Sequence, residues 1–281
     1  MYTIGMRILT KEKRVAVVAA LVEGNSIRAT VRMTGVAKKT VIKLLVDLGR
    51  ACLEYQDRTL RGLHCKRIQC DEIWSFCYGK QKNLPENLRY RDGYGDVWTW
   101  TAICADSKLV ACWHVGNRNP ADANAFIQNL AGRMVERIQI NTDGLDSYLE
   151  AIAVAFNKQV DYSQIVKVYG KPKGKKGSHF TPDEVIAVKR ERKIGHPDVK
   201  HTSTSFVERQ NLTMRMSMRR FTRSTNAFSK KLDNLKWAVA LHFMYYNFAR
   251  IHQTLRCSPA MRAGVTDTLW SIEDIVGLLP K

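Results

Sequence analysis

Three acidic residues occur at positions where carboxylates could do chemistry. Asp71 lies in the middle of a segment, 66–78, that alternates like a β-strand, although acids are depleted from strands. Asp143 closes another strand-like run, and Glu208 is the only acid in the basic segment 203–220. Carboxylate oxygens are the ligands that Mg²⁺ prefers. Two such ions can activate a water or hydroxyl and stabilise the departing oxygen of a phosphodiester.

Each acid also has a structural explanation. Asp143 is followed by Gly144, as in an ordinary turn, and Glu208 could be a first-turn acid that the helix dipole favours. Asp71 is harder to explain in this way, because an unpaired carboxylate within a sheet is costly. Taken together, the three acids favour a shared metal site.

The segment 203–220 predicts an amphipathic helix with two faces. Apolar residues recur at helical spacing and are expected to pack on a sheet: Val207, Met214, Met218 and Phe221. A second stripe begins with the acid and continues with amides and bases: Glu208, Asn211, Arg215 and Arg219. A merely solvated helix would mix its charges in pairs. We therefore expect Asn211, Arg215 and Arg219, with the neighbouring Arg209, to contact DNA phosphates.

Composition points in the same direction. The chain has 281 residues and a formal net charge of +19, which favours a polyanionic partner such as DNA or RNA over a membrane surface. The seven cysteines include no C-x-x-C pair, so we expect neither a disulfide framework nor a zinc ribbon. No targeting or membrane-spanning segment is visible, which predicts a soluble protein of a reducing, intracellular compartment.

Residues 1–52 predict a small helical DNA-binding domain. Thr10 and Ser26 are N-cap residues for two helices, and a third helix follows Gly35 with the spacing of a helix-turn-helix. Its first residues suit a groove or phosphates: Lys38, Lys39 and Thr40. The alternative is a three-helix bundle that docks elsewhere. Residues 53–65 lose periodicity and predict a linker.

The central region alternates strands and helices. The expected order, β-β-β-α-β-α-β, predicts a mixed sheet with helices packed on it. A basic loop at 170–200 either is solvated or follows a phosphate backbone, through Lys171, Lys173, Lys175 and Lys176. Thr225-Asn226 is expected to cap a later helix, and 253–281 forms a tail. The six tryptophans are expected in the core rather than as base-stacking platforms, Trp74 and Trp98 first among them.

Several motifs together resemble the insertion-sequence-1 family of bacterial DDE transposases. They are Cys70–Trp74 (CDEIW), Asn141–Tyr148 (NTDGLDSY), Phe206–Leu212 (FVERQNL), Arg219–Phe221 (RRF) and Phe228–Lys231 (FSKK). The similarity covers roughly residues 66 to 250. Residues 246–255 also resemble the closing stretch of integrase-type DDE enzymes.

The resemblance implies an α/β fold: an RNase H-like mixed sheet flanked by helices, at 66–252, preceded by the all-α helix-turn-helix domain. It implies catalysis with Mg²⁺, for which Mn²⁺ could substitute, by Asp71, Asp143 and Glu208. Arg215 takes the place of a basic residue that contacts the element end. Some relatives carry an N-terminal zinc motif of cysteines, which this chain lacks, so zinc is not predicted.

The primary hypothesis is therefore a DNA transposase that binds element ends and catalyses strand cleavage and strand transfer. We expect it to act on DNA as a homodimer or larger assembly, in the bacterial cytoplasm at the nucleoid and without a membrane partner. Two alternatives stay open. One is a domesticated, non-catalytic DNA-binding protein, and the other is an RNase H-like nuclease without strand transfer.

Overall fold

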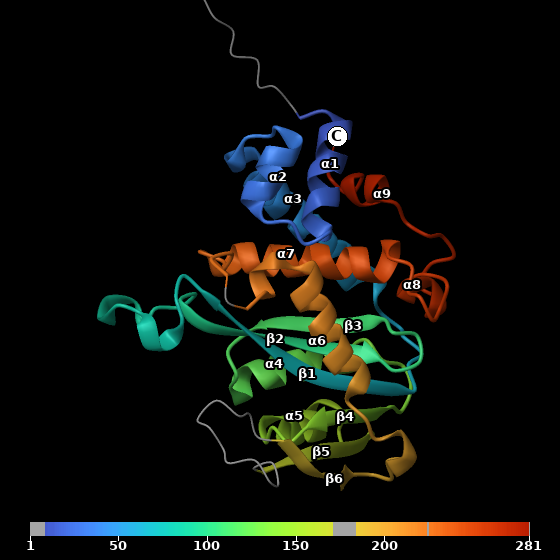
Figure 1. The fold of residues 1–281 in the computed structure, drawn as a ribbon. Helices are drawn as coiled ribbons and strands as arrows, with labels where there is room; N and C mark the ends of the chain where they lie inside the picture. The colour runs from blue at the N-terminus through green and yellow to red at the C-terminus, as the bar shows by residue number, and fades with distance from the viewer. Residues whose placement is uncertain (1–8, 171–183, 224, 281) are drawn as a thin grey trace, which may run out of the picture. The chain divides into compact units, whose positions relative to one another are not determined.

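The computed structural model describes residues 9–170, 184–223 and 225–280. It shows an α/β fold with a mixed six-stranded sheet, in the order β3-β2-β1-β4-β5-β6, flanked by helices (Figure 1). The strands are β1 (Arg67–Cys77), β2 (Gly95–Cys104), β3 (Val110–Gly116), β4 (Gln139–Asp143), β5 (Asp161–Gly170) and β6 (Glu184–Ile194). The α-helices are α1 (Lys11–Val22), α2 (Ile27–Thr34), α3 (Lys38–Thr59), α4 (Pro120–Ala131), α5 (Ser147–Ala155), α6 (Ser205–Ser217), α7 (Leu232–Met244), α8 (Pro259–Arg262) and α9 (Ile272–Val276).

None of the helices within the described ranges combines the length and the apolar character that crossing a membrane requires.

Short-range signals explain where the early helices begin and end. The side chains of Thr10 and Ser26 accept hydrogen bonds from backbone N–H groups in the first turns of α1 and α2, as predicted. Gly35 ends α2 in the left-handed conformation that glycine adopts without strain. Asn119 caps α4, where Pro120 occupies the first turn. Helices α2 and α3 are thus present where helices were predicted, while the helix-turn-helix and its role in DNA binding stay predictions.

The chain divides into two compact units, and the division passes through β1, β2 and α6. One unit contains α1 to α3, residues 74–97 and the chain from Leu212 onward. The other contains residues 61–73 and 98–211. These bounds differ from the predicted domains, because the N-terminal helices cluster with the C-terminal ones.

In the second unit the sheet carries helices on the face of Trp100. This residue of β2 is buried and packs against Phe126 of α4 and Tyr148 of α5. Strand β4 pairs in parallel with both β1 and β5, whereas β5 and β6 are antiparallel. The expected mixed sheet flanked by helices is confirmed.

The prediction of a loop over 170–200 is wrong for residues 184–194, which form strand β6 along β5. The backbone pairs even though most of its side chains are exposed and many are basic. An exposed edge strand lacks the apolar alternation that marks a strand in the sequence. Lys171, Lys173, Lys175 and Lys176 lie outside the described residues.

The predicted linker 53–65 is also helical as far as Thr59. Gln56 is buried on the apolar face of α3, where its amide donates to the carbonyl oxygens of Cys52 and Ala240. A buried polar residue at this position interrupts the apolar period and hides the helix in the sequence. The predicted helix start at Thr225-Asn226 is wrong as well, because α7 begins at Leu232.

The prediction that Trp74 and Trp98 are the first tryptophans in the core is wrong. Trp74 and Trp98 are only half-buried, while Trp100 is fully buried. Trp98 and Trp100 lie two residues apart in β2 and therefore share one face of the sheet. The sequence pattern alone therefore did not tell which of the two the helices cover.

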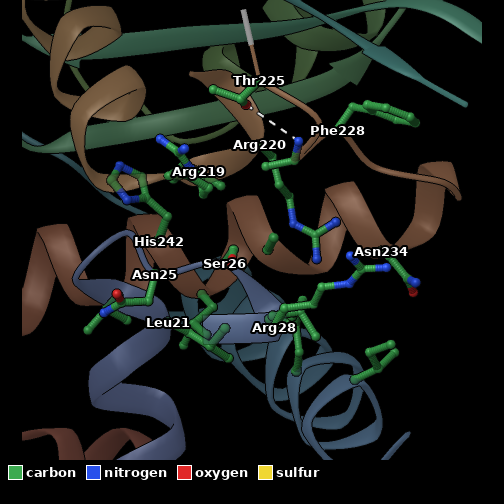
Figure 2. Close-up of a pocket in the computed structure, with 18 of the residues that line it drawn as sticks. Leu21, Asn25, Ser26, Arg28, Arg219, Arg220, Thr225, Phe228, Asn234 and His242 are labelled. Atoms are coloured by element: carbon green, nitrogen blue, oxygen red, sulfur yellow. Dashed lines mark hydrogen bonds between the residues drawn. The ribbon is translucent and has the colours of Figure 1, made fainter. Parts of the chain in front are cut away.

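The first unit depends on a close approach between α3 and α7. A Cβ added to Gly49 would lie 2.5 Å from the Cβ of Trp237 and 2.6 Å from its carbonyl oxygen. This unit also contains a cavity of 710 Å³, into which Arg28, Arg219 and His242 project (Figure 2). We call it the larger cavity.

We expect Gly49→Ala to destabilise the protein by about 1–3 kcal/mol, the usual cost of overpacking a tight interior contact. The added methyl group meets the backbone of Trp237, which cannot rotate away. Gly132→Ala is the control, because its Cβ would meet nothing closer than 3.6 Å. Urea unfolding of both variants tests this, and equal midpoints would contradict it.

Candidate metal centre

Two carboxylates meet because of the register between β1 and β4. The strands are parallel, and Gln69 pairs with Asn141. Asp71 and Asp143 each lie two residues beyond this pair on their own strands. Since side chains on a strand alternate with a period of two, both residues lie on the same side of the sheet as Gln69 and Asn141. The register therefore brings together two acids that are distant in the sequence.

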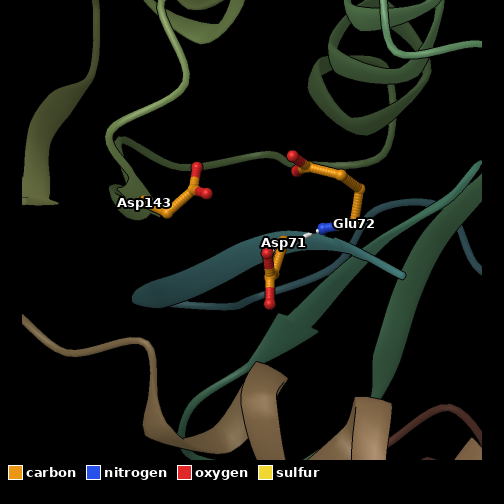
Figure 3. Close-up of side chains that lie close together, drawn as sticks. All are labelled: Asp71, Glu72 and Asp143. Carbon is orange, nitrogen blue, oxygen red and sulfur yellow. Dashed lines mark hydrogen bonds between the residues drawn. The ribbon is translucent and has the colours of Figure 1, made fainter. Parts of the chain in front are cut away.

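Glu72 is the third acid of the group. One carboxylate oxygen from each of Asp71, Glu72 and Asp143 lies within 4.8 Å of the others. Asp71 and Glu72 leave β1 in opposite directions, and Asp143 faces them from the end of β4 (Figure 3). Strand alternation places Glu72 on the opposite side of β1 from Asp71, so the sequence pattern did not predict it as a member of the group.

The Glu72 carboxylate is held by two donors. Arg118 Nε donates to one oxygen at 2.6 Å, and the Tyr148 hydroxyl donates to the other at 3.1 Å. The Arg118 guanidinium also lies 3.8 Å from the Asp143 carboxylate and over the ring of Trp98. Burial raises the pKa of Tyr148 well above its ordinary value, so this hydroxyl keeps the proton that it donates. These contacts fix Glu72 and neutralise part of the negative charge.

Burial and the negative charge that Arg118 does not neutralise raise the pKa values of Asp71 and Glu72. Burial raises the pKa of Asp71 to about 7, and the charges of Glu72 and Asp143 act in the same direction. Burial and then Asp143 also raise the pKa of Glu72, although Arg118 and Tyr148 oppose the change. A divalent cation would relieve this repulsion, and the ligand atoms are all hard oxygens. The three carboxylates could therefore hold a hard divalent cation.

Helix α6 is fixed to β1 by two side chains of the strand. The buried Gln69 Oε1 accepts hydrogen bonds from the backbone N–H groups of Phe206, at 2.8 Å, and Val207, at 3.2 Å. One helical turn later, Asn211 Nδ2 donates to Asp71 Oδ2 at 2.8 Å. Both contacts orient the first turns of α6 toward the carboxylates.

Glu208 lies between these two contacts but outside the group of three acids. Its Oε1 accepts from Lys167 Nζ at 2.6 Å and from the Thr204 hydroxyl at 2.7 Å. Its charge still contributes to raising the pKa of Asp71. The structure thus brings Asp71 and Asp143 together as predicted, while the role of Glu208 as a ligand stays a prediction.

The predicted DNA-binding residues occupy several places. Lys38, Lys39 and Thr40 are exposed in the first turn of α3. Arg209 is exposed on α6, whereas Asn211 is engaged with Asp71. Arg215 is half-buried and donates to the carbonyl oxygen of Phe221 at 3.4 Å.

Arg219 follows α6 in a short 3₁₀ turn, Arg219–Phe221, and is exposed along the larger cavity. The expected apolar stripe of the helix is buried at Val207, Met214, Met218 and Phe221.

Three residues of the site were missed from the sequence: Glu72, Arg118 and Tyr148. Tyr148 belongs to a motif quoted above, and Glu72 adjoins Asp71, so both could have been suspected. Arg118 lies in a loop whose sequence carries no comparable signal. Its role depends on where that loop lies in three dimensions.

Comparison of the chain with protein-family models found no match, and comparison with curated proteins found none either.

We expect Asp71→Asn to stabilise the metal-free protein more at pH 8 than at pH 5. The folded pKa of about 7 exceeds the ordinary 3.8, so the Asp71 contribution to stability is lost as pH rises through this window. Each pKa unit corresponds to about 1.4 kcal/mol. The asparagine does not titrate and escapes this loss.

Melting temperatures with a chelator present, at both pH values, measure the effect. The difference between variant and parent is expected to grow by at least about 3 °C from pH 5 to pH 8. Asp92→Asn, an exposed acid outside the cluster, is the control. An equal difference in melting temperature at both pH values would show that the pKa of Asp71 is not raised in the folded protein.

Proposed function

We propose that this protein is a DNA transposase of an insertion sequence, with an RNase H-like catalytic core. The observation that carries the proposal is the cluster of Asp71, Glu72 and Asp143, within 4.8 Å, at the meeting of two parallel strands. The net charge of +19 supports a polyanionic substrate. The motif resemblance selects strand cleavage and joining among the reactions open to such a site.

In the proposed mechanism Asp71 and Asp143 would hold Mg²⁺, and Glu208, which pairs with Lys167 in this structure, would be the third ligand. When bound, the metal polarises a phosphodiester oxygen and stabilises charge on the attacking and departing oxygens. Asn211 keeps the Asp71 carboxylate in place through its amide. Arg118 and Tyr148 keep Glu72 fixed, which maintains a strongly negative field around the ligands.

The same residues would serve two successive reactions. In the first, water attacks the phosphodiester at an element end and the 3′ oxygen departs with a proton. In the second, the oxygen of this 3′-hydroxyl attacks a phosphodiester of target DNA and forms a bond to its phosphorus. The 3′ oxygen of the target strand leaves and takes up the proton, so the element end becomes joined to the 5′ phosphate of the target. Because both ends of the element must be joined to target DNA, the protein would act on DNA as at least a dimer.

Asp71→Asn and Asp143→Asn are each expected to lower Mg²⁺-dependent nicking by about 10²–10³-fold or more, the effect of removing one electrostatic stabiliser of a transition state. DNA binding is expected to persist, because the substitutions remove negative charge. The substrate is the DNA that flanks the gene, labelled at its 3′ ends. Nicking by Asp71→Asn at the parental rate would refute the site.

Strand transfer separates a transposase from a nuclease. Pre-cleaved ends and a supercoiled plasmid are supplied with Mg²⁺, and joined products are measured on a gel. Joining supports the transposase, whereas nicking without joining supports the nuclease. A protein that only binds DNA would shift the mobility of the DNA on a gel with or without metal, and would neither nick nor join it.

Paired substitutions identify the third ligand. We expect Glu208→Gln to abolish nicking and Glu72→Gln only to raise the Mg²⁺ concentration needed for half-maximal rate. Both oxygens of Glu72 are engaged by Arg118 and Tyr148, whereas Glu208 is exposed and paired with a lysine that can move. A magnesium titration of both variants measures this. An active Glu208→Gln with an inactive Glu72→Gln would transfer the ligand role to Glu72.

A further inference from the structure

A row of aromatic side chains borders a second cavity in the first unit. Trp74, Phe76 and Phe228 follow one another, with ring centroids 5.6 Å apart for the first pair and 5.1 Å for the second. All three line a cavity of 430 Å³ and are only half-buried. Part of their apolar surface therefore stays open to a ligand. We call this the aromatic cavity.

The polar lining of the aromatic cavity is basic. Lys80, Arg215, Arg220 and Arg223 line it, and none of its described lining residues is acidic. Arg220 donates to the Ser229 hydroxyl at 2.5 Å, and Lys80 lies over the ring of Trp74. Within the described ranges, no ion pair joins any of these four cations to a carboxylate. Positive charge gathered without a counter-charge favours an anionic ligand.

The larger cavity continues this basic surface, because it shares Arg220 and Phe228 with the aromatic cavity. Its lining adds Arg28 and Arg219 (Figure 2). Lys38 lines it too, and none of the described lining residues is an acid. His242 is buried in this lining, and neither ring nitrogen has a hydrogen-bond partner in the described part of the chain. A buried polar group without a partner is costly, so a ligand that reaches it would be stabilised.

Aromatic rings and cations in this combination fit a nucleotide with an accessible base. Bases stack on aromatic side chains while phosphates contact lysine and arginine. A base within a duplex has both faces covered by its neighbours, so only an unpaired base can enter. The volume of 430 Å³ lies within the range of small-ligand sites, about 300–1,000 Å³.

We propose that the aromatic cavity binds one unpaired nucleotide of a DNA strand, and that the neighbouring phosphates follow the larger cavity. The base enters the cavity and stacks against the row of rings formed by Trp74, Phe76 and Phe228. The inference rests on the proposed function, since it assumes a DNA substrate, and it adds that part of this substrate is unpaired when bound.

The test compares two duplex probes that share the same phosphates. One carries a single-nucleotide bulge with a base, and the other carries an abasic bulge at the same position. Full-length protein is titrated into each without divalent metal, and fluorescence anisotropy gives the affinities. We expect the base to improve affinity about tenfold or more, the size of one stacking interaction.

A bulge of 2-aminopurine gives an independent readout. Its fluorescence is expected to be quenched on binding, because the base stacks against an aromatic ring. Trp74→Leu and Phe228→Leu are expected to bring the base-to-abasic affinity ratio near one, whereas Trp74→Phe restores most of it. Tyr90→Leu, at an exposed aromatic outside both cavities, is expected to leave the ratio unchanged.

The outcomes separate the two proposals. Equal affinity of the parent for base and abasic probes, in a protein that still nicks DNA with Mg²⁺, overturns the inference alone. A base preference without nicking supports the inference and refutes the catalytic proposal. If the leucine variants keep the full ratio, the base lies elsewhere and the inference is wrong.

Discussion

The candidate site depends on the attachment of α6 to β1. A helix start leaves backbone N–H groups without partners inside the helix. Gln69, a buried side chain of the strand, accepts two of them, from Phe206 and Val207. Asn211 then joins the same helix to Asp71, two residues further along β1. Because a helix is rigid over one turn, these contacts determine where Glu208 can lie. Without these contacts the position of Glu208 on α6 relative to Asp71 on β1 would not be fixed.

The site combines attraction and repulsion in a small volume. Three carboxylates gather on the sheet, and Arg118 neutralises only part of their charge. The raised pKa of Asp71 is the physical consequence. Such an arrangement costs stability in the metal-free protein and favours a divalent cation. The net charge of +19 around this acidic cluster is the feature on which the proposed phosphodiester substrate depends, because cations attract a polyanion.

Local signals predicted most elements well. N-cap residues such as Thr10 and Ser26 act within one turn, so their effect is legible in the sequence. Errors arose where tertiary contacts override local pattern. Gln56 continues α3 past its predicted end because its amide is satisfied by Ala240, on another helix. Strand β6 forms because β5 offers backbone partners, although its own residues are polar and exposed.

By itself, the sequence determined the alternating strands and helices, the basic character of the chain and the choice of Asp71 and Asp143 as candidate ligands. Composition and periodicity suffice for these, since neither requires knowledge of contacts between distant residues. Only the tertiary structure decided that Glu72 joins the acids, that Arg118 and Tyr148 hold it, and that Glu208 pairs with Lys167. These relations depend on strand register and on loop position, which bring together residues that no sequence spacing connects.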